Sequence, residues 1–208
     1  MTDEGPMAKG SSPELLVELL AELDREVAPH VGSLRAQPGT SADEVRRSIG
    51  QFGLEAPDEL VVLYGWHDGI TPKRKSPYPD FGITSLRVSC IGYDTRHTGF
   101  LRDSPTAEDI DAITWGGGPG WFPLYPAQYT IVVDCNGPAD VSPRVRFTDI
   151  EFEDKQFPRI SGQAVSLCTV ITWRIEGIRS GVYTWNTQNG EWDTDWNYMT
   201  PAQRASSL

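Results

Sequence analysis

Residues 56–69 read Ala-Pro-Asp-Glu-Leu-Val-Val-Leu-Tyr-Gly-Trp-His-Asp-Gly and predict a short helix that runs into a compact turn. Pro57 suits the first turn of a helix, where its missing backbone N–H costs no hydrogen bond. Asp58 and Glu59 place negative charge beside the positive end of the helix dipole. Three bulky side chains share one helical face, namely Leu60, Leu63 and Tyr64. We therefore expect a helix that buries this face.

The segment after this helix has the composition of a turn. Gly65 is expected to end the helix, because glycine commonly occupies the position just after the last helical residue. Trp66, His67 and Asp68 then place aromatic and charged groups side by side, and Gly69 can adopt a positive φ that most residues avoid. The turn is therefore a candidate for contact with a partner.

The length of 208 residues predicts one domain with one packed core. We expect a disordered leader over residues 1–10, a single domain over 11–199 and a disordered tail over 200–208, because the two ends offer little to bury. The longest apolar run, Leu60–Tyr64, is too short to cross a bilayer, and residues 1–12 do not resemble a secretion signal. The expected location is the cytoplasm, with no membrane partner.

The formal net charge of −11 bears on the choice of partner. Phosphate binding needs concentrated Lys and Arg, so nucleic acid is not expected. A basic protein is the easier partner, although acidity can also serve only to keep a protein soluble and monomeric. The one basic cluster, residues 73–75, lies in a proline-rich segment that is predicted to be a solvated loop.

The cysteines and histidines show no spacing typical of a disulfide framework, a metal site or a catalytic pair. They are Cys90, Cys135, Cys168, His30, His67 and His97. The cysteines are expected to be small buried groups. His67-Asp68 could pair with a distant cysteine, but a polar turn is the commoner explanation. With no Gly-x-Ser-x-Gly motif either, the sequence predicts no catalytic residues, no cofactor and no metal.

Two amphipathic helices are predicted before residue 56. The first starts with a capping box, Ser11-x-x-Glu14, and is expected to end near Pro29. Its apolar stripe is Leu16, Leu19, Leu20, Leu23 and Val27, and its acidic side is Glu18, Glu22, Asp24 and Glu26. The acidic side is expected to face solvent. The second helix starts with the capping box Ser41-x-x-Glu44 and ends at Gly53.

The middle of the chain carries weaker signals. Leu86, Cys90, Tyr93, His97 and Leu101 keep helical spacing, whereas Val88–Tyr93 would also suit a strand, and a helix is the favoured interpretation. The glycine run of residues 115–121 lacks the Gly-Lys-Ser/Thr ending of a phosphate loop. We expect it to be an irregular entry to the next strand.

The clearest strand is Tyr129–Asp134, which is apolar on both faces and is expected to be central in the sheet. Residues 144–148 alternate between polar and apolar, and residues 149–153 alternate in the opposite phase, which predicts a turn or bulge between them. Four acids would line a solvated strand face, namely Asp149, Glu151, Glu153 and Asp154. A cation site is the less favoured interpretation of these acids.

The C-terminal part predicts a helix over Gln163–Ile178 and a hairpin over residues 182–196 that turns at Gln188-Asn189-Gly190. Three helices before the first strand favour the α+β class over alternating βαβ units. The expected fold has N-terminal amphipathic helices packed on a central, mostly antiparallel sheet, with a further helix and a closing hairpin at the C-terminus.

The order of these motifs resembles the SUKH superfamily, the Smi/Knr-like group that includes a yeast cell-wall assembly regulator and many bacterial toxin-immunity proteins. The segments that carry the resemblance are residues 53–60, 63–64, 66–69, 121–124, the strand ending in Asp134, residues 144–149 and residues 181–185. It covers roughly Ser11 to Trp185. The chain departs from the pattern at Ala56, where many members have Leu, and over residues 70–115.

The resemblance implies a non-catalytic protein-binding module. The motif positions expected to be structural are Pro57, Leu60, Tyr64, Gly69, Trp121, Pro123, Asp134, Gly181 and Tyr183. The residues expected to bind a partner are Trp66, His67, Asp68, Asp149, Glu151, Glu153 and Asp154. The implied function is that of an immunity protein, a monomer or weak dimer, which neutralises a basic toxin domain such as a nuclease. A regulatory adaptor of the Smi/Knr type is the alternative, and a hydrolase with an unrecognised site is a distant third.

Overall fold

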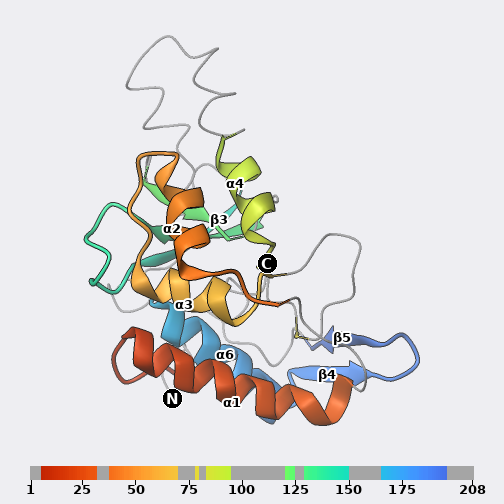
Figure 1. The fold of residues 1–208 in the computed structure, drawn as a ribbon. Helices are drawn as coiled ribbons and strands as arrows, with labels where there is room; N and C mark the ends of the chain where they lie inside the picture. The colour runs from red at the N-terminus through yellow and green to blue at the C-terminus, as the bar shows by residue number, and fades with distance from the viewer. Residues whose placement is uncertain are drawn as a thin grey trace.

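The two longest described helices lie side by side and form one layer of the molecule (Figure 1). The structure is a computed structural model that describes residues 6–31, 38–69, 78–79, 83–94, 120–124, 129–149 and 165–195. Helix α1 spans Pro13–Val31 and helix α6 spans Leu167–Arg179. The apolar stripe of α1 is buried at Leu16, Leu20, Leu23 and Val27, as its spacing predicts.

The two ends of α1 differ from the prediction. The backbone N–H of Leu15 donates to the hydroxyl of Ser12 at 3.2 Å, so Ser12 caps the helix in place of Ser11. The helix also continues through Pro29 to Val31. Val31 is buried, and its burial helps to offset the one helical hydrogen bond that Pro29 cannot make.

Helix α2, Ala42–Gly50, packs on helix α3, Asp58–Trp66, which in turn packs on α1. The N–H of Glu44 donates to the hydroxyl of Ser41 at 3.3 Å, which is the backbone half of the predicted capping box. Within α2, Val45 and Ile49 are buried. The predicted apolar face therefore attaches α2 to the core.

Helix α3 begins directly after Pro57 and buries its predicted face. Leu60, Leu63 and Tyr64 are at most 1% exposed. The helix does not end at Gly65. It continues to Trp66, because the N–H of His67 still donates to the Leu63 carbonyl at 3.3 Å. One more residue of helix places the Trp66 side chain beside α1.

Residues 86–94 form helix α4, Leu86–Asp94, so the helical interpretation is confirmed for this segment. The ring of Tyr93 stacks on that of Phe122 in the sheet, with centroids 5.9 Å apart. The N–H of Thr84 donates to the Leu124 carbonyl at 2.9 Å. Helix α4 is thus attached to the first strand. The predictions for residues 73–75, 97–101 and 104–119 concern segments outside the described residues.

Three antiparallel strands form a sheet in the order β1-β2-β3. Their bounds are Trp121–Pro123, Tyr129–Asp134 and Val145–Asp149. Strand β2 has the predicted bounds and the predicted central place. Ile131, Val132 and Val133 are all buried, which confirms that the middle of β2 is covered on both faces.

Trp121 and Asp134 face each other across β1 and β2, at one end of the sheet. One oxygen of Asp134 accepts from the backbone N–H of Asn136 at 3.1 Å, and the other accepts from Nε of Arg144 at 2.8 Å. The Arg144 guanidinium also lies 5.5 Å from the centre of the Trp121 ring. The structural role expected for Trp121 and Asp134 thus has a physical basis, because both residues take part in one set of contacts with Arg144.

Replacing Asp134 by asparagine is expected to lower the free energy of unfolding by about 1–3 kcal/mol near pH 7, because hydrogen bonds to a charged group are lost. Burial raises the pKa of Asp134, but the bonds from Asn136 and Arg144 outweigh burial and hold it below the ordinary value of 3.8. A lowered folded pKa contributes stability above 3.8 that disappears as pH falls through the folded value.

Urea unfolding of both proteins between about pH 7 and pH 3 tests this expectation. The stability gap between wild type and Asp134→Asn should narrow at the acidic end. Asp140→Asn, which removes one exposed carboxylate from the same loop, serves as the charge control. A gap that stayed constant with pH would contradict the assigned role of the Asp134 carboxylate.

A separate two-stranded sheet closes the described chain and projects beside the end of α1 (Figure 1). Strands β4, Tyr183–Asn186, and β5, Glu191–Thr194, pair around a turn in which Gly190 has a φ of +63°. The Trp192 ring lies 5.5 Å from that of Trp185 and 5.3 Å from that of His30 in α1. The hairpin matches the prediction, and its aromatic side is held against α1.

The described part of the chain has the predicted α+β class, with N-terminal helices before the sheet and a hairpin at the end. Of the predicted leader, residues 6–10 contain no helix or strand, and the N–H of Ala8 donates to the Thr169 hydroxyl at 3.3 Å. Residues 1–5 and the predicted tail lie outside the described residues. Among the described helices, none has the length and apolarity that a bilayer span requires.

Candidate binding site

An acidic side chain of α1 lies among three aromatic rings at the C-terminal end of α3. Asp24 accepts hydrogen bonds from the indole N–H of Trp66 at 2.8 Å and from the hydroxyl of Tyr78 at 2.6 Å. Nε2 of His67 lies 3.8 Å from the same carboxylate. The Trp66 ring centre is 4.3 Å from that of His67 and 4.7 Å from that of Tyr78. We call Asp24, Trp66, His67 and Tyr78 the aromatic–acid cluster.

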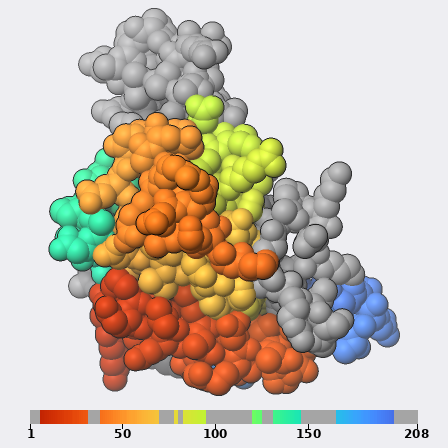
Figure 2. All heavy atoms as spheres, viewed as in Figure 1, coloured from red at the N-terminus to blue at the C-terminus, as the bar shows by residue number. Residues whose placement is uncertain are grey.

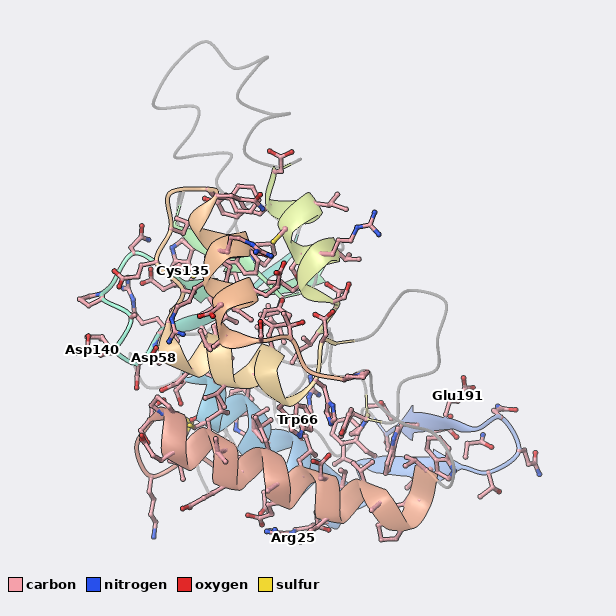
Figure 3. The ribbon with its side chains drawn as sticks, in the orientation of Figure 1. Arg25, Asp58, Trp66, Cys135, Asp140 and Glu191 are labelled. Atoms are coloured by element: carbon pink, nitrogen blue, oxygen red, sulfur yellow. The ribbon has the colours of Figure 1, made fainter. Side chains whose placement is uncertain are left out.

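The cluster joins two helices that are distant in the sequence. Figure 3 shows Trp66 at the end of α3, above α1. Asp24 comes from the middle of α1, and Tyr78 from the segment after α3. Because Trp66 and Tyr78 donate to different oxygens of Asp24, the carboxylate is held in one orientation.

The carboxylate of Asp24 keeps its negative charge. Burial alone would raise its pKa, but His67 and the hydrogen bonds from Tyr78 and Trp66 outweigh burial and hold the pKa below its ordinary value. Burial and the Asp24 charge both raise the pKa of Tyr78, so the Tyr78 hydroxyl stays a donor. The Asp24 side chain is 44% exposed. It is therefore a fixed anion that solvent can reach.

Asp68, the third predicted contact of this turn, points toward α4. Its carboxylate accepts the backbone N–H of Leu86, the first residue of that helix, at 2.8 Å. A carboxylate at a helix N-terminus satisfies an unpaired donor and complements the dipole. Within the predicted trio, Trp66 and His67 thus lie in the cluster, whereas Asp68 positions α4.

The predicted acidic strand face lies largely outside the described residues. Asp149 is the last residue of β3 and pairs in register with Tyr129. Glu151, Glu153 and Asp154 follow beyond the described part of the sheet, as does the predicted change of phase after Asp149. In the described residues, no group of three or more His, Cys, Asp or Glu side chains could hold a metal ion.

The positions expected to be structural lie in the core or at its turns. Leu60, Tyr64, Trp121 and Tyr183 are at most 4% exposed. Pro57 occupies the position just before the first residue of α3, and Pro123 ends β1. Gly69 and Gly181 have φ values of +61° and +76°. The Tyr183 hydroxyl accepts a hydrogen bond from the buried guanidinium of Arg174.

Glu59 has a role that its place in the first helical turn did not indicate. It is 1% exposed, and its Oε1 accepts from the Ser11 hydroxyl at 2.8 Å and from the Ser142 hydroxyl at 2.6 Å. The carboxylate therefore links the segment before α1 to the loop between β2 and β3. It does more than complement the dipole of α3.

The three cysteines are buried and free, as expected. Burial raises the pKa of Cys90 to about 11 and that of Cys135 to about 12, with a further rise from nearby carboxylates. Burial also raises the pKa of Cys168. Because the thiolate is the reactive form, these thiols are poor nucleophiles at neutral pH.

Sequence reasoning missed Asp24 and Tyr78. Asp24 was assigned to the solvated side of α1, yet it lies four residues after Leu20 and three before Val27, within the spacing of the buried stripe. A charged residue in an apolar stripe is a signal that a partner group lies opposite. Tyr78 gave no such signal, because it sits in an irregular proline-rich segment.

A comparison with protein-family models and with curated proteins finds no match to this chain. The function is therefore argued from the motifs, the charges and the cluster described above.

Proposed function

We propose that the protein is a non-catalytic binding module for a basic protein, and specifically a cytoplasmic immunity protein that neutralises a cognate toxin domain. The order of motifs that resembles the SUKH superfamily supports this proposal, and so does the net charge of −11. The observation that carries it is the unequal pairing of surface charges.

In the described part of the chain, four of the six exposed arginines are paired with carboxylates of the fold, and Arg25 and Arg87 are not. The pairs are Arg46 with Asp58, Arg47 with Glu44, Arg144 with Asp134, and Arg179 with Glu22 and Glu26. Glu14, Glu18 and Asp43 are exposed and form no ion pair in the described part of the chain. The surface therefore carries surplus negative charge that would attract a basic partner.

A nuclease-type toxin fits this surface, because its own surface must attract phosphate. Neutralisation needs tight contact and no chemistry from the immunity protein. The buried and protonated cysteines support a non-catalytic role, since they supply no nucleophile. The partner is therefore expected to be a basic domain whose activity falls when it is bound.

We expect a basic toxin domain to be encoded beside this protein, and the rate at which the two associate to fall steeply from low to physiological salt. Long-range attraction speeds encounter and is screened by ions, whereas packed contacts that slow dissociation respond less. Stopped-flow or surface-based kinetics at several salt concentrations would measure both rates. An association rate insensitive to salt would refute electrostatic steering, and the absence of binding or protection would refute the immunity function.

Two charge reversals of equal size locate the steering surface. The first changes Glu151, Glu153 and Asp154 to lysine, and the second changes Glu14, Glu18 and Asp43 to lysine. Each should slow association more than it speeds dissociation if net charge alone guides encounter. A larger effect of the first set would assign the contact to the strand face predicted from the sequence.

A further inference from the structure

We propose that Asp24 is the anchor for a guanidinium group of the basic partner, an inference that rests on the proposed binding function. The sequence assigned Asp24 to a solvated helix face. In the structure it lies at the centre of the aromatic–acid cluster, and its side chain is 44% exposed. The cluster thus offers an anion that is surrounded by aromatic rings and open to solvent.

The carboxylate of Asp24 has capacity for further donors. Its oxygens accept hydrogen bonds from Trp66 at 2.8 Å and from Tyr78 at 2.6 Å, and Nε2 of His67 lies 3.8 Å from the oxygen that Tyr78 contacts. An ionised carboxylate oxygen offers about two acceptor positions. The oxygen that is bonded to Trp66 therefore keeps capacity for a further donor, and the 44% exposure of the side chain lets a group approach it from solvent.

The two internal bonds also prepare the carboxylate for binding. A free aspartate side chain loses rotamer freedom when it pairs with a ligand, and that loss weakens binding. Here Trp66 and Tyr78 have already fixed the side chain, and the lowered pKa of Asp24 keeps it charged through the physiological range. A partner cation would meet a preorganised anion.

The surrounding rings favour a guanidinium over a compact ammonium. Arginine can donate two parallel hydrogen bonds to a carboxylate, and its flat group stacks on aromatic rings. The rings of Trp66 and His67 have centres 4.3 Å apart and are partly exposed, whereas Tyr78 is buried behind them as a hydrogen-bond donor. This combination of a carboxylate with adjoining rings suits an arginine side chain of the partner.

Titration of the full chain with Nα-acetylargininamide, followed by the indole N–H signal of Trp66 in NMR, tests the proposal. Trp66→Phe identifies that signal among the seven tryptophans. The probe is expected to shift the signal in a saturable way. Nα-acetylcitrullinamide, which replaces the guanidinium by a neutral urea of the same shape, should bind about tenfold more weakly because the charge-assisted bonds are lost.

Three variants separate binding from support of the fold. Asp24→Asn should weaken binding of the arginine probe about tenfold. Glu55→Gln removes an exposed charge outside the aromatic–acid cluster and should leave the affinity unchanged. Tyr78→Phe removes one of the two internal hydrogen bonds but keeps the Asp24 charge, so it should weaken binding of the arginine probe less than Asp24→Asn does, even if the protein melts earlier.

Equal shifts with the arginine and citrulline probes, or unchanged affinity in folded Asp24→Asn, would overturn the proposal. If Asp24→Asn does not fold, the comparison of the two probes on the wild type still decides the question. The proposed immunity function is tested by a different result from the one that tests the Asp24 anchor. A toxin domain that binds Asp24→Asn as tightly as wild type refutes only the anchor, whereas a toxin that binds neither protein refutes the immunity function.

Discussion

Trp121→Ala is expected to lower the free energy of unfolding by about 3–5 kcal/mol, the usual cost of removing a buried aromatic side chain. Trp121 is 4% exposed and begins β1, a strand of three residues. It faces Asp134 across the sheet, and the Arg144 guanidinium lies over its ring. The substitution therefore removes buried apolar area and also the ring on which the guanidinium of the Asp134–Arg144 ion pair lies. Urea unfolding followed by circular dichroism would measure the loss.

Trp185→Ala is the matched control, because Trp185 is only partly buried, on the β4–β5 hairpin. Trp185→Ala should lower the free energy of unfolding by a smaller amount, about 1–2 kcal/mol. Trp121→Phe should recover part of the stability that alanine removes. If Trp121→Ala melted like wild type while binding of the toxin domain vanished, Trp121 would belong to the binding surface and its structural role would be wrong.

The elements with strong local periodicity could be predicted from the sequence. The spacing of the leucines defines α1, and the continuous apolar run of Tyr129–Asp134 defines β2 with its correct bounds. In α1 the apolar residues repeat at the helical period, and in β2 a short continuous run of β-branched residues favours a strand that is covered on both faces. These local patterns are sufficient without knowledge of what packs against the two elements.

Boundaries were less predictable because tertiary contacts override local signals. Pro29 and Gly65 are ordinary helix terminators, yet α1 and α3 continue beyond them. Val31 gains burial, and Trp66 gains a hydrogen bond to Asp24. Such contacts help to offset the cost of extending each helix, and no local pattern encodes the partner.

The candidate site was predictable only in part for the same reason. Trp66 and His67 could be predicted as candidate contact residues, because aromatic and charged side chains are adjacent there in the sequence. Their acidic partner lies on another helix, 42 residues before Trp66, and Tyr78 lies 54 residues beyond Asp24. Asp68 was grouped with Trp66 and His67 because it follows them in the sequence. In the structure it caps α4, whose first residue lies 18 positions later and is brought next to Asp68 only by the fold.

Gly69→Ala is expected to destabilise the protein by about 3 kcal/mol or more, through two separate effects. Gly69 has a φ of +61°, which costs an alanine roughly 1 kcal/mol. A Cβ at this position would also overlap the backbone carbonyl of Thr84 and lie 2.8 Å from the Ile83 carbonyl oxygen. Since backbone atoms cannot turn aside as a side chain does, the segment before α4 would have to move.

Gly181→Ala separates the two effects, because Gly181 has a φ of +76° but a Cβ there would meet no atom within 4 Å. Gly181→Ala should lower the free energy of unfolding by only about 1 kcal/mol, so the difference in stability between the two variants measures the clash at Gly69. Movement at Gly69 should also disturb the hydrogen bond from the N–H of Leu86 to Asp68 at the start of α4, and it should change the NMR signal of the Trp66 indole. Equal losses in the two alanine variants would show that no clash exists, and that the turn after α3 tolerates a side chain.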